Sequence, residues 1–358
     1  MSDIVITGLG AVTCLGGSVP ELWAGLAEAR PPDPRHAVAT RYPQLGRASA
    51  MALDAARQAA TDAALSTSDI AAAGLVTGTT LGDIDVFEGD GAAADTGPYR
   101  LTEVVATELG STGPTHSIST ACSSGVYAVS TAADLVAAGV ADVVLACGSD
   151  CLSAVSRAML ARFELLDPDR CRPFDTDRAG MVPGEGAGAV VVESAASARA
   201  RGAQPYATVA SCAWSADAYH PTAPEPSGDR FAAAMAEAVR TTGQPGVLLP
   251  HRAGIPLNDT VETTAAITAL GEYAPDTPAY GIKAMLGHTA GAAGVLACVA
   301  GALILRAGTV PPNANVATLD PDCALPVPLT TTPLPRPRVL VTATGFGGSN
   351  AALVLGAA

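Results

Sequence analysis

The segment from His116 to Gly139 constrains the fold of this 358-residue chain more than any other. The short run at residues 117–120, which includes the β-branched Ile118 and Thr120, predicts a strand, and residues 121–125 turn it directly into a helix. That helix is apolar or small nearly all the way round, which is typical of a helix inside a domain rather than on its face. Gly125 and Ala128 leave room for a ligand or a second helix. We therefore expect a domain built around this helix.

Cys122 lies at the turn into the helix. The unpaired N–H groups and the positive dipole end of a helix N-terminus would favour thiolate over thiol there. Cys122 is therefore a candidate nucleophile. The alternative is an inert cysteine packed as a small hydrophobe. The segment alone leaves both interpretations open.

Composition excludes several classes of function. Hydrophobic residues make up 49% of the chain, which is ample for a buried core, and the length suggests two domains or one duplicated unit. A net charge of −14 gives no general attraction to nucleic acid or anionic membrane. An acidic partner would need a local arginine patch, for which Arg199 and Arg201 are candidates. A strand begins at once at the N-terminus, and the apolar window 291–305 is too short for a membrane span, so we expect a cytoplasmic protein.

The cysteine and lysine usage adds two indications. Eight scattered cysteines are typical of reduced thiols, and Cys147 and Cys151 lack a second ligand pair, so we expect no zinc site. The chain contains nineteen Arg and a single Lys, Lys283. This bias suggests that position 283 requires an ammonium on a thin stem, although chance is a fair rival.

The order of expected elements repeats along the chain. Residues 8–10 lack the third glycine of a dinucleotide fingerprint, so we expect no such cofactor. Two α/β halves, residues 1–205 and 206–358, follow each other without a low-complexity linker, which indicates internal duplication. Strands are expected at 3–13, 74–79, 117–120, 141–148, 189–193, 206–213, 246–249, 279–282, 338–344 and 350–356, and helices at 20–29, 49–65, 99–109, after Cys122, and at 195–201, 227–242, 258–269 and 289–306.

Two loops stand out between these elements. Residues 82–98 are polar and glycine-rich. Residues 171–180, Cys-Arg-Pro-Phe-Asp-Thr-Asp-Arg-Ala-Gly, are charged but flanked by apolar segments. The charged loop is either a surface turn or a buried network that braces an active site, and the sequence favours neither.

Two of the five histidines occupy positions typical of sites in parallel α/β sheets. His251 and His288 both lie where strands end and helices begin. His36 and His116 have no such setting, and His220, in a proline-rich loop, could line an entrance. The pair at 251 and 288 is therefore the candidate set of functional histidines.

One nucleophilic cysteine with two imidazoles suits carbon–carbon bond formation. Two neutral imidazole N–H donors can converge on one oxygen, which helps when a carboxylate leaves as CO2 and an enolate must be stabilised. The segment Gly345-Phe-Gly-Gly-Ser-Asn350 would supply a second backbone N–H beside the nucleophile, and Phe346 would guard the pocket.

A set of short motifs runs in order along the whole chain. They are Val5-Ile-Thr-Gly-Leu-Gly, Ser119-Thr-Ala-Cys-Ser-Ser-Gly125, Arg172-Pro-Phe-Asp175, Gly184-Glu-Gly-Ala-Gly188, Asp217-Ala-Tyr-His220, Pro256-Leu-Asn-Asp259, Lys283, Gly287-His-Thr289, Gly291-Ala-Ala-Gly294 and Gly345-Phe-Gly-Gly-Ser-Asn350. Together these motifs resemble the elongating β-ketoacyl synthases of dissociated, type II fatty-acid or polyketide systems. The resemblance implies a thiolase-like fold, a five-layer αβαβα sandwich of two pseudo-duplicated halves that is normally dimeric.

The resemblance also implies roles for particular residues. Cys122 would be acylated, His251 and His288 would serve decarboxylation and condensation, and Lys283 would support the site electrostatically. Backbone N–H groups of Cys122 and Phe346 would form the oxyanion hole. The implied substrate-binding residues are Gly345, Gly347 and Thr289. No cofactor would be bound, since the phosphopantetheine arm of an acyl carrier protein delivers the substrate. The partners would be that carrier and a second copy or a second ketosynthase-like subunit.

The chain departs from the family pattern in three ways. At 251–255, Ala253 and Ile255 replace the two hydroxyl residues expected to bind the pantetheine arm, and Arg252 replaces a glycine. Ala297 replaces a glutamate that often pairs with Lys283. The chain is also shorter than typical members, mainly before residue 45 and around 240–250, which would thin the approach to His251.

Three functions remain open at this point. The first is a ketosynthase that condenses an acyl thioester with malonyl-acyl carrier protein. The second is a chain-length-factor-like subunit that shapes the pocket of an active partner, which the departures favour and the intact Cys122 opposes. The third is acyl transfer without decarboxylation.

Overall fold

The computed structural model describes residues 4–29, 33, 35, 37–90 and 97–358. Its strands form one continuous sheet in the order β3-β2-β4-β5-β1-β6-β11-β10-β7. The first half of the chain supplies β1 (Ile4–Val12), β2 (Gly74–Gly78), β3 (Thr115–Ile118), β4 (Val143–Asp150) and β5 (Gly186–Ser194). The second half supplies β6 (Ala207–Ala216), β7 (Val247–Leu249), β10 (Arg338–Gly345) and β11 (Ser349–Gly356).

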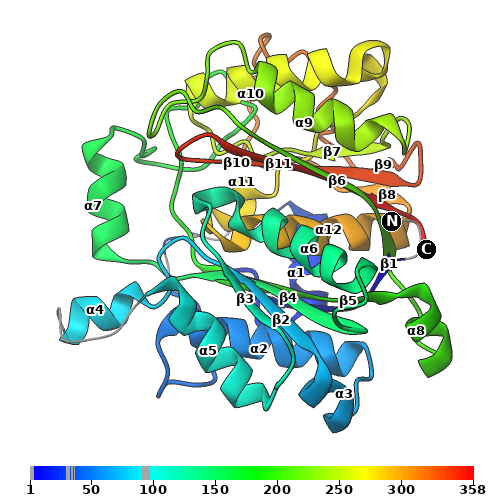
Figure 1. Ribbon diagram of the computed structural model, residues 1–358. Coiled ribbons are helices and arrows are strands. Elements are labelled where there is room, and N and C mark those ends of the chain that lie inside the picture. Colours follow the sequence, from blue (N-terminus) through cyan, green and yellow to red (C-terminus); the bar gives the residue numbers. More distant parts are fainter. Residues whose placement is uncertain (1–3, 30–32, 34, 36, 91–96) are drawn as a thin grey trace.

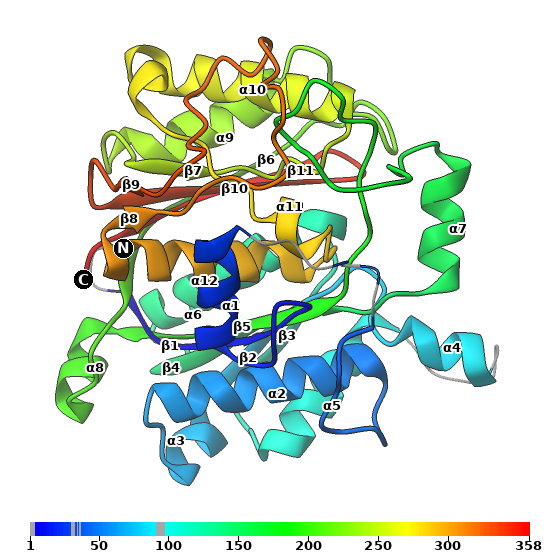
Figure 2. The same ribbon diagram turned by 180° about the vertical axis from the view of Figure 1, so that it is seen from behind.

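The sheet folds into two facing layers with helices inside and outside (Figures 1 and 2). Antiparallel pairing of Val5 with Thr208 and of Ile6 with Ala207 joins the two layers at one edge. Between them lie α6 (Ser124–Ala137) and α12 (Ala292–Ala307), while α2 (Arg47–Asp62) and α5 (Pro98–Leu109) cover one outer face. The other outer face is covered by α9 (Asp229–Arg240) and α10 (Pro256–Leu270). The predicted five-layer αβαβα sandwich is confirmed, and the boundary at 205 stays a prediction.

The central strands are apolar because helices cover both of their faces. Every residue of β4 and all but the last of β5 are buried. β4 runs parallel to β2 and antiparallel to β5. A continuous apolar run is the pattern expected of such strands. β3, whose residues are exposed or half-buried, ends this sheet order.

The two inner helices approach each other through glycines. A Cβ added to Gly125 on α6 would lie 2.6 Å from the carbonyl oxygen of Gly291, and one added to Gly294 on α12 would lie 2.5 Å from the nitrogen of Val126. Side chains cannot fit at such distances, so the helix backbones cross in direct contact. The space expected beside Gly125 is thus filled by a second helix. This crossing brings the start of α6, after Cys122, close to the start of α12, after His288.

The predicted elements are nearly all present, and four differences concern the segments around the site. Within the expected loop at 82–98 a helix, α4 (Ile84–Asp90), forms, and residues 91–96 lie outside the described residues. The helix α7 (Ala154–Arg162) was not expected, because it buries no residue and carries no apolar stripe. The short α11 (Lys283–Leu286) was also missed. The predicted strand at 279–282 is wrong, since this segment makes only an isolated bridge from Ala279 to Leu248.

Smaller elements complete the description. These are α1 (Val19–Glu28), α3 (Thr67–Ala72), α8 (Ala195–Arg201), the two-residue strands β8 (Thr309–Val310) and β9 (Thr332–Pro333), and the 3₁₀ turns η2 (Ala121–Ser123) and η3 (Gly271–Asp276). All eight cysteines are unpaired. None of the helices in the described part of the chain has the length and apolar character needed to cross a bilayer.

Candidate active site

Cys122 lies in the middle of the tight turn η2 between β3 and α6. The preceding residue, Ala121, has φ +53°, a left-handed conformation that costs a non-glycine residue free energy. The Ser124 hydroxyl donates to the Ala121 carbonyl at 2.6 Å and accepts from the Thr120 N–H at 2.9 Å. These bonds hold the strained turn that carries Cys122.

The end of β10 lies against this turn. A Cβ on Gly345 would lie 2.5 Å from the Thr120 carbonyl oxygen, so only glycine allows this approach. The next residue, Phe346, is half-buried, and its ring meets that of Phe163 edge to face at 6.3 Å between centroids. The turn that carries Cys122 and the loop that carries Phe346 are therefore neighbours, as the sequence predicts.

The two predicted histidines come together from different elements. His251 follows β7 and His288 follows α11, and their ring centroids are 5.3 Å apart at 89°. The His288 backbone is held by bonds from its N–H to Val182 O at 2.8 Å and from Gly184 N–H to its carbonyl at 3.1 Å. Both side chains are buried. The structure thus pairs two imidazoles that lie 37 positions apart in the sequence.

Both imidazoles are neutral at physiological pH. Burial, and secondly the charge of Lys283, lower the pKa of His288 to about 3 and hold that of His251 well below its usual value. Neither ring nitrogen of His288 has a hydrogen-bond partner among the described residues. Buried polar atoms are normally paired, so these nitrogens are available for a ligand oxygen. Neutral rings of this kind match the expected pair of N–H donors.

Lys283 joins the histidines from the start of α11. Its Nζ donates to the carbonyl oxygen of His251. Burial lowers the pKa of this lysine, and the nearby charge of Glu262 acts in the opposite direction. The positive charge of Lys283 also acts on Cys122, where it opposes burial by lowering the pKa of the thiol.

The predicted thiolate at Cys122 is wrong for the resting protein. Burial raises the pKa of its thiol to about 12, although the charge of Lys283 opposes this shift. The residue keeps some exposed surface, but protein surrounds its sulfur. Desolvation of an anion outweighs the favourable lysine charge here. The sulfur is therefore held as a thiol until a reaction partner removes its proton.

Glu262 is a site residue that the sequence analysis missed. It lies on α10, is buried, and accepts hydrogen bonds from the backbone N–H groups of His251 and Arg252, both at 2.7 Å. It also accepts from the Thr342 hydroxyl at 2.8 Å. Its charge supplies the negative partner that Ala297 cannot give Lys283. The sequence feature that could have indicated Glu262 is its position one turn after Asp259, in a helix that begins beside the altered loop.

Two cavities meet at the sulfur of Cys122. Cys122, Met181, His288 and Phe346 line both of them. The first cavity is completed by Thr222, Ala223, Pro224, His251, Ile255, Asn258, Thr344, Gly345 and Gly348. The second is largely apolar and includes Cys151, Leu152, Met159 and Leu160. A thioester at Cys122 would therefore have a cavity lined by both histidines on one side and a largely apolar cavity on the other.

Comparison with known proteins places this arrangement in a family. Residues 36–198 match the family described as Beta-ketoacyl synthase, N-terminal domain, and residues 206–317 match Beta-ketoacyl synthase, C-terminal domain. The chain is 32% identical to 3-oxoacyl-[acyl-carrier-protein] synthase 2 of Synechocystis sp., over 98% of this chain and 97% of that protein. The chain belongs to the β-ketoacyl synthase family.

Other relatives of this ketosynthase point the same way. It is 34% identical to Nodulation protein E of Rhizobium meliloti over 98% of each chain. It is 39% identical to the Putative polyketide beta-ketoacyl synthase 1 of Streptomyces virginiae over 72% of this chain, a match that spans only 64% of that relative. Among solved structures, the ishigamide ketosynthase/chain length factor superposes with TM-score 0.89 at 32% identity, covering 100% of this chain and 99% of that one.

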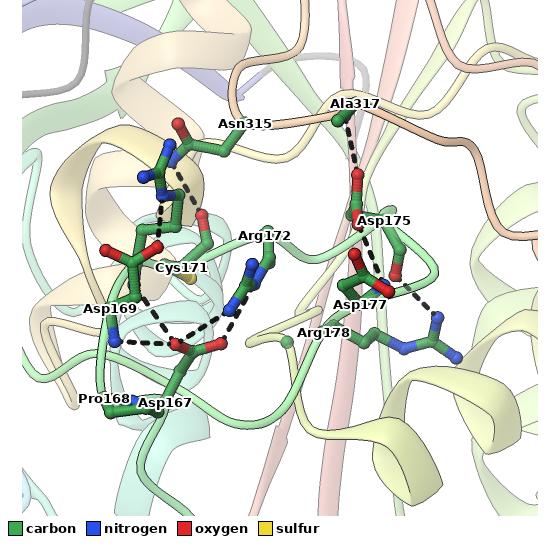
Figure 3. Close-up of polar contacts among 12 residues, drawn as sticks. Asp167, Pro168, Asp169, Cys171, Arg172, Asp175, Asp177, Arg178, Asn315 and Ala317 are labelled. Atoms are coloured by element: carbon green, nitrogen blue, oxygen red, sulfur yellow. Dashed lines mark hydrogen bonds and ion pairs between the residues drawn. The ribbon is translucent and has the colours of Figure 1, made fainter.

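The charged loop at 171–180 of the ketosynthase forms a network of hydrogen bonds and ion pairs (Figure 3). Asp175 is buried, whereas Thr176, Asp177 and Ala179 are exposed, so the loop combines features of both interpretations. Asp175 accepts from the N–H groups of Ala317 at 2.6 Å and Thr318 at 2.9 Å. Arg178 pairs with Asp320 and lies 3.8 Å from Asp259. The loop thereby braces the first turn of α10.

A second arm of this network reaches the lysine helix. The Asn315 amide donates to the carbonyl oxygens of Cys171 at 2.8 Å and Ala284 at 3.0 Å, so it ties the charged loop to α11 (Figure 3). Arg172 pairs with Asp167 at 3.1 Å. The Asn315 contact with Ala284 thus fixes the backbone directly after Lys283.

In the altered loop at 251–255, the Arg252 side chain lies outside the ketosynthase site. The guanidinium carbon lies 4.8 Å from the centre of the Phe174 ring, and Nη1 donates to the Pro173 carbonyl at 3.2 Å. Arg252 does not line either cavity at Cys122. The replacement of a glycine by Arg252 therefore does not narrow either cavity, whereas Ile255 lines the first one with an apolar side chain.

Other predicted residues lie at the margins. Thr289 is buried at the turn into α12, Gly347 is exposed, and neither lines the two cavities. His220 is exposed, and its Nδ1 accepts from the N–H groups of Thr222 at 3.1 Å and Ala223 at 3.0 Å, so it shapes the loop at the entrance. His116 is exposed on β3, and His36 lies outside the described residues.

Proposed function

We propose that this ketosynthase catalyses the decarboxylative Claisen condensation of an acyl thioester with malonyl-acyl carrier protein. The observation that carries the proposal is the pair of buried neutral imidazoles beside Cys122, with both nitrogens of His288 unpaired among the described residues. Neutral donors without protein partners suit a substrate oxygen that gains negative charge.

The first half-reaction loads Cys122. Its sulfur forms a bond to the acyl carbon, the bond from that carbon to the carrier sulfur breaks, and the thiol proton passes to the departing carrier thiolate. Since burial raises the pKa of the thiol, a neutral imidazole nitrogen that accepts the proton in passing lowers the barrier. Backbone N–H groups of Cys122 and Phe346 stabilise the tetrahedral oxyanion in this proposal.

The second half-reaction forms the carbon–carbon bond. Malonyl thioester loses CO2, and N–H donors from His251 and His288 stabilise the resulting enolate oxygen. The enolate carbon attacks the acyl carbon on Cys122, the C–S bond breaks, and the β-ketoacyl product stays on the carrier. The cysteine leaves as a thiolate, which the charge of Lys283 stabilises. Phosphopantetheine acts as a substrate arm, and no resident cofactor is needed.

Partner surfaces follow from the exposed elements near Cys122. The edge strand β3 offers unpaired backbone groups directly before the nucleophile turn, which suits pairing with a second copy or a second ketosynthase-like subunit. The exposed Arg157 and Arg162 on α7 have no ion-pair partner among the described residues and suit an acidic carrier. Arg201, the candidate from the sequence, is on α8 and pairs with Glu193 at 2.5 Å. The helix α8 lies at the opposite end of the molecule from α7 in both views (Figures 1 and 2).

The chain-length-factor-like role stands as the second candidate. The absence of hydroxyls at Ala253 and Ile255 favours it, and one solved relative is titled a ketosynthase/chain length factor. This role predicts that the isolated chain is inactive and stable only beside another synthase subunit. Co-purification with candidate partners, followed by assay of the chain alone, separates the two roles.

Intact-protein mass spectrometry tests the loading step. After incubation with acyl-acyl carrier protein, the wild-type chain gains the mass of one acyl group, while Cys122→Ala gains none. Cys147→Ala is the matched control, because Cys147 is fully buried in β4 and lines neither cavity. Undiminished labelling of Cys122→Ala would contradict the assignment.

A further inference from the structure

The loop that has lost its two hydroxyls lies beside a polar side chain with no assigned role. Asn258 is in the first turn of α10 and lines the same cavity as Cys122, His251 and His288. Among all residues that line this cavity it is the one carboxamide. Its amide forms no hydrogen bond within the described residues, and the side chain is half-buried. The group is therefore both placed at the site and unused by the fold.

The backbone fixes Asn258 next to the altered loop. The neighbouring Asp259 accepts from the N–H groups of Ala253 and Gly254, both at 3.2 Å. The buried Arg178, which pairs with Asp320, lies 3.8 Å from the same carboxylate. The start of α10 is thus tied to residues 253–254 by bonds on both oxygens of one side chain. A side chain at 258 shares the cavity wall with Ile255, whose own side chain cannot form a hydrogen bond.

The order of residues along the cavity gives the direction of the substrate arm. His251 and His288 are buried, whereas Asn258 and the loop residues Thr222, Ala223 and Pro224 are half-buried. An arm that reaches Cys122 through this cavity would therefore pass Ile255 and Asn258, which line it. The arm that follows such a thioester contains secondary amides, each with one N–H donor and one C=O acceptor. A carboxamide offers the same two functions and can pair with such an amide on both sides.

We propose that Asn258 binds an amide of the pantetheine arm and so replaces the hydroxyl contacts that Ala253 and Ile255 cannot make. This inference rests on the proposed loading of Cys122 by a pantetheine thioester. Asn258 is a binding residue for the arm and takes no part in bond making at the sulfur. It explains how a chain with an apolar residue at 255 can still position a carrier-linked substrate.

The test compares two thioesters of the same acyl group. One is the acyl-pantetheine, and the other is the S-ethyl thioester, which has no amide. The ratio of their second-order rates of Cys122 acylation, measured by intact mass, should fall about tenfold in Asn258→Ala, the loss expected for one hydrogen bond. Thr260→Ala is the matched control, since Thr260 is exposed on the same helix and, among the described residues, its hydroxyl bonds only to Pro256 O at 3.0 Å. It should keep the wild-type ratio.

A rescue and a second readout make the result specific. Asn258→Ala combined with Ile255→Thr restores a hydroxyl to the same wall and should recover part of the pantetheine preference, which a merely structural role of Asn258 would not explain. Free pantetheine should also slow alkylation of Cys122 by iodoacetamide, with an apparent dissociation constant about tenfold weaker in Asn258→Ala.

The outcomes separate the inference from the function on which it rests. An unchanged acylation ratio together with unchanged protection in Asn258→Ala overturns the role of Asn258 and leaves the proposed function standing. In a second outcome, pantetheine protects Cys122 of the wild type from iodoacetamide and protects it more weakly in the variant, but the wild type is never acylated. This outcome supports the role of Asn258 and overturns the proposed function. Wild-type protein that is neither acylated nor protected overturns both.

Discussion

Replacing Glu262 with Gln tests whether one buried carboxylate holds the histidine loop. The carboxylate accepts three hydrogen bonds, from the N–H groups of His251 and Arg252 and from the Thr342 hydroxyl. Glutamine keeps one acceptor oxygen, so its NH2 group must face at least one backbone N–H. One buried N–H without an acceptor costs about 1–3 kcal/mol, and loss of charge assistance weakens the other two bonds by about 1 kcal/mol each. The expected destabilisation is about 3–5 kcal/mol.

Urea unfolding measures this change against Glu272→Gln. Glu272 is exposed in η3, so its substitution should change stability by less than about 0.5 kcal/mol. Activity should fall as well, on the order of 100-fold, because the same bonds position His251 and the charge of Glu262 supports Lys283. Hydrogen exchange at residues 251 and 252 should become faster. If Glu262→Gln matches Glu272→Gln in both stability and activity, the carboxylate does not organise this loop and the reasoning fails.

Three further predictions use other parts of the site. Alkylation of Cys122 by iodoacetamide should accelerate about tenfold per pH unit from pH 7 to 10, since burial raises the pKa of its thiol to about 12. Lys283→Met should be alkylated more slowly at every pH, because the ammonium of Lys283 lowers that pKa. A plateau of the rate near pH 8 would contradict this prediction. The free energy of unfolding should decline as the pH falls from about 6.5 towards 3, because His288 takes up a proton in the unfolded chain but not in the folded protein, where its ring is buried. His288→Asn should flatten this decline. Parallel curves of stability against pH for the two proteins would count against the burial argument. Gly125→Ala should lower both stability and the rate of Cys122 acylation, because the added Cβ would lie 2.6 Å from Gly291 O. Gly17→Ala should behave like the wild type, because open space surrounds Gly17. Equal behaviour of the two variants would refute the role of the helix crossing.

Much of the framework could be predicted because local pattern determines it. The run from β3 through Cys122 into α6 combines a β-branched strand with a helix of small residues, and each signal stands in the sequence. His251 could be placed in advance because it follows the strand β7, and strand ends are the usual address of such sites. His288 follows the helix α11, so the strand-end reasoning does not account for it and the family resemblance indicated its pairing with His251. The family resemblance then supplied the layer order.

The remainder depends on groups that are distant in sequence. The thiol of Cys122 is not a thiolate, because apolar walls from several elements desolvate it, and no local pattern reports those walls. Glu262 contacts residues 251, 252 and 342, which only the folded chain brings together. The helix α7 lies over the apolar cavity without burying a residue, so its pattern contains no stripe. Arg252 turns towards Phe174, a direction that position alone does not determine.

The central claim is that Cys122, His251 and His288 form a working condensing site despite the altered loop. Its most direct test supplies the acyl-loaded protein with malonyl-acyl carrier protein labelled at the free carboxyl group, and measures labelled CO2 together with the β-ketoacyl product. The account predicts CO2 and product in equal amounts, with both abolished in His288→Ala. Acyl-loaded Cys122 that persists with neither CO2 nor product, in the presence of a functional carrier, would contradict it.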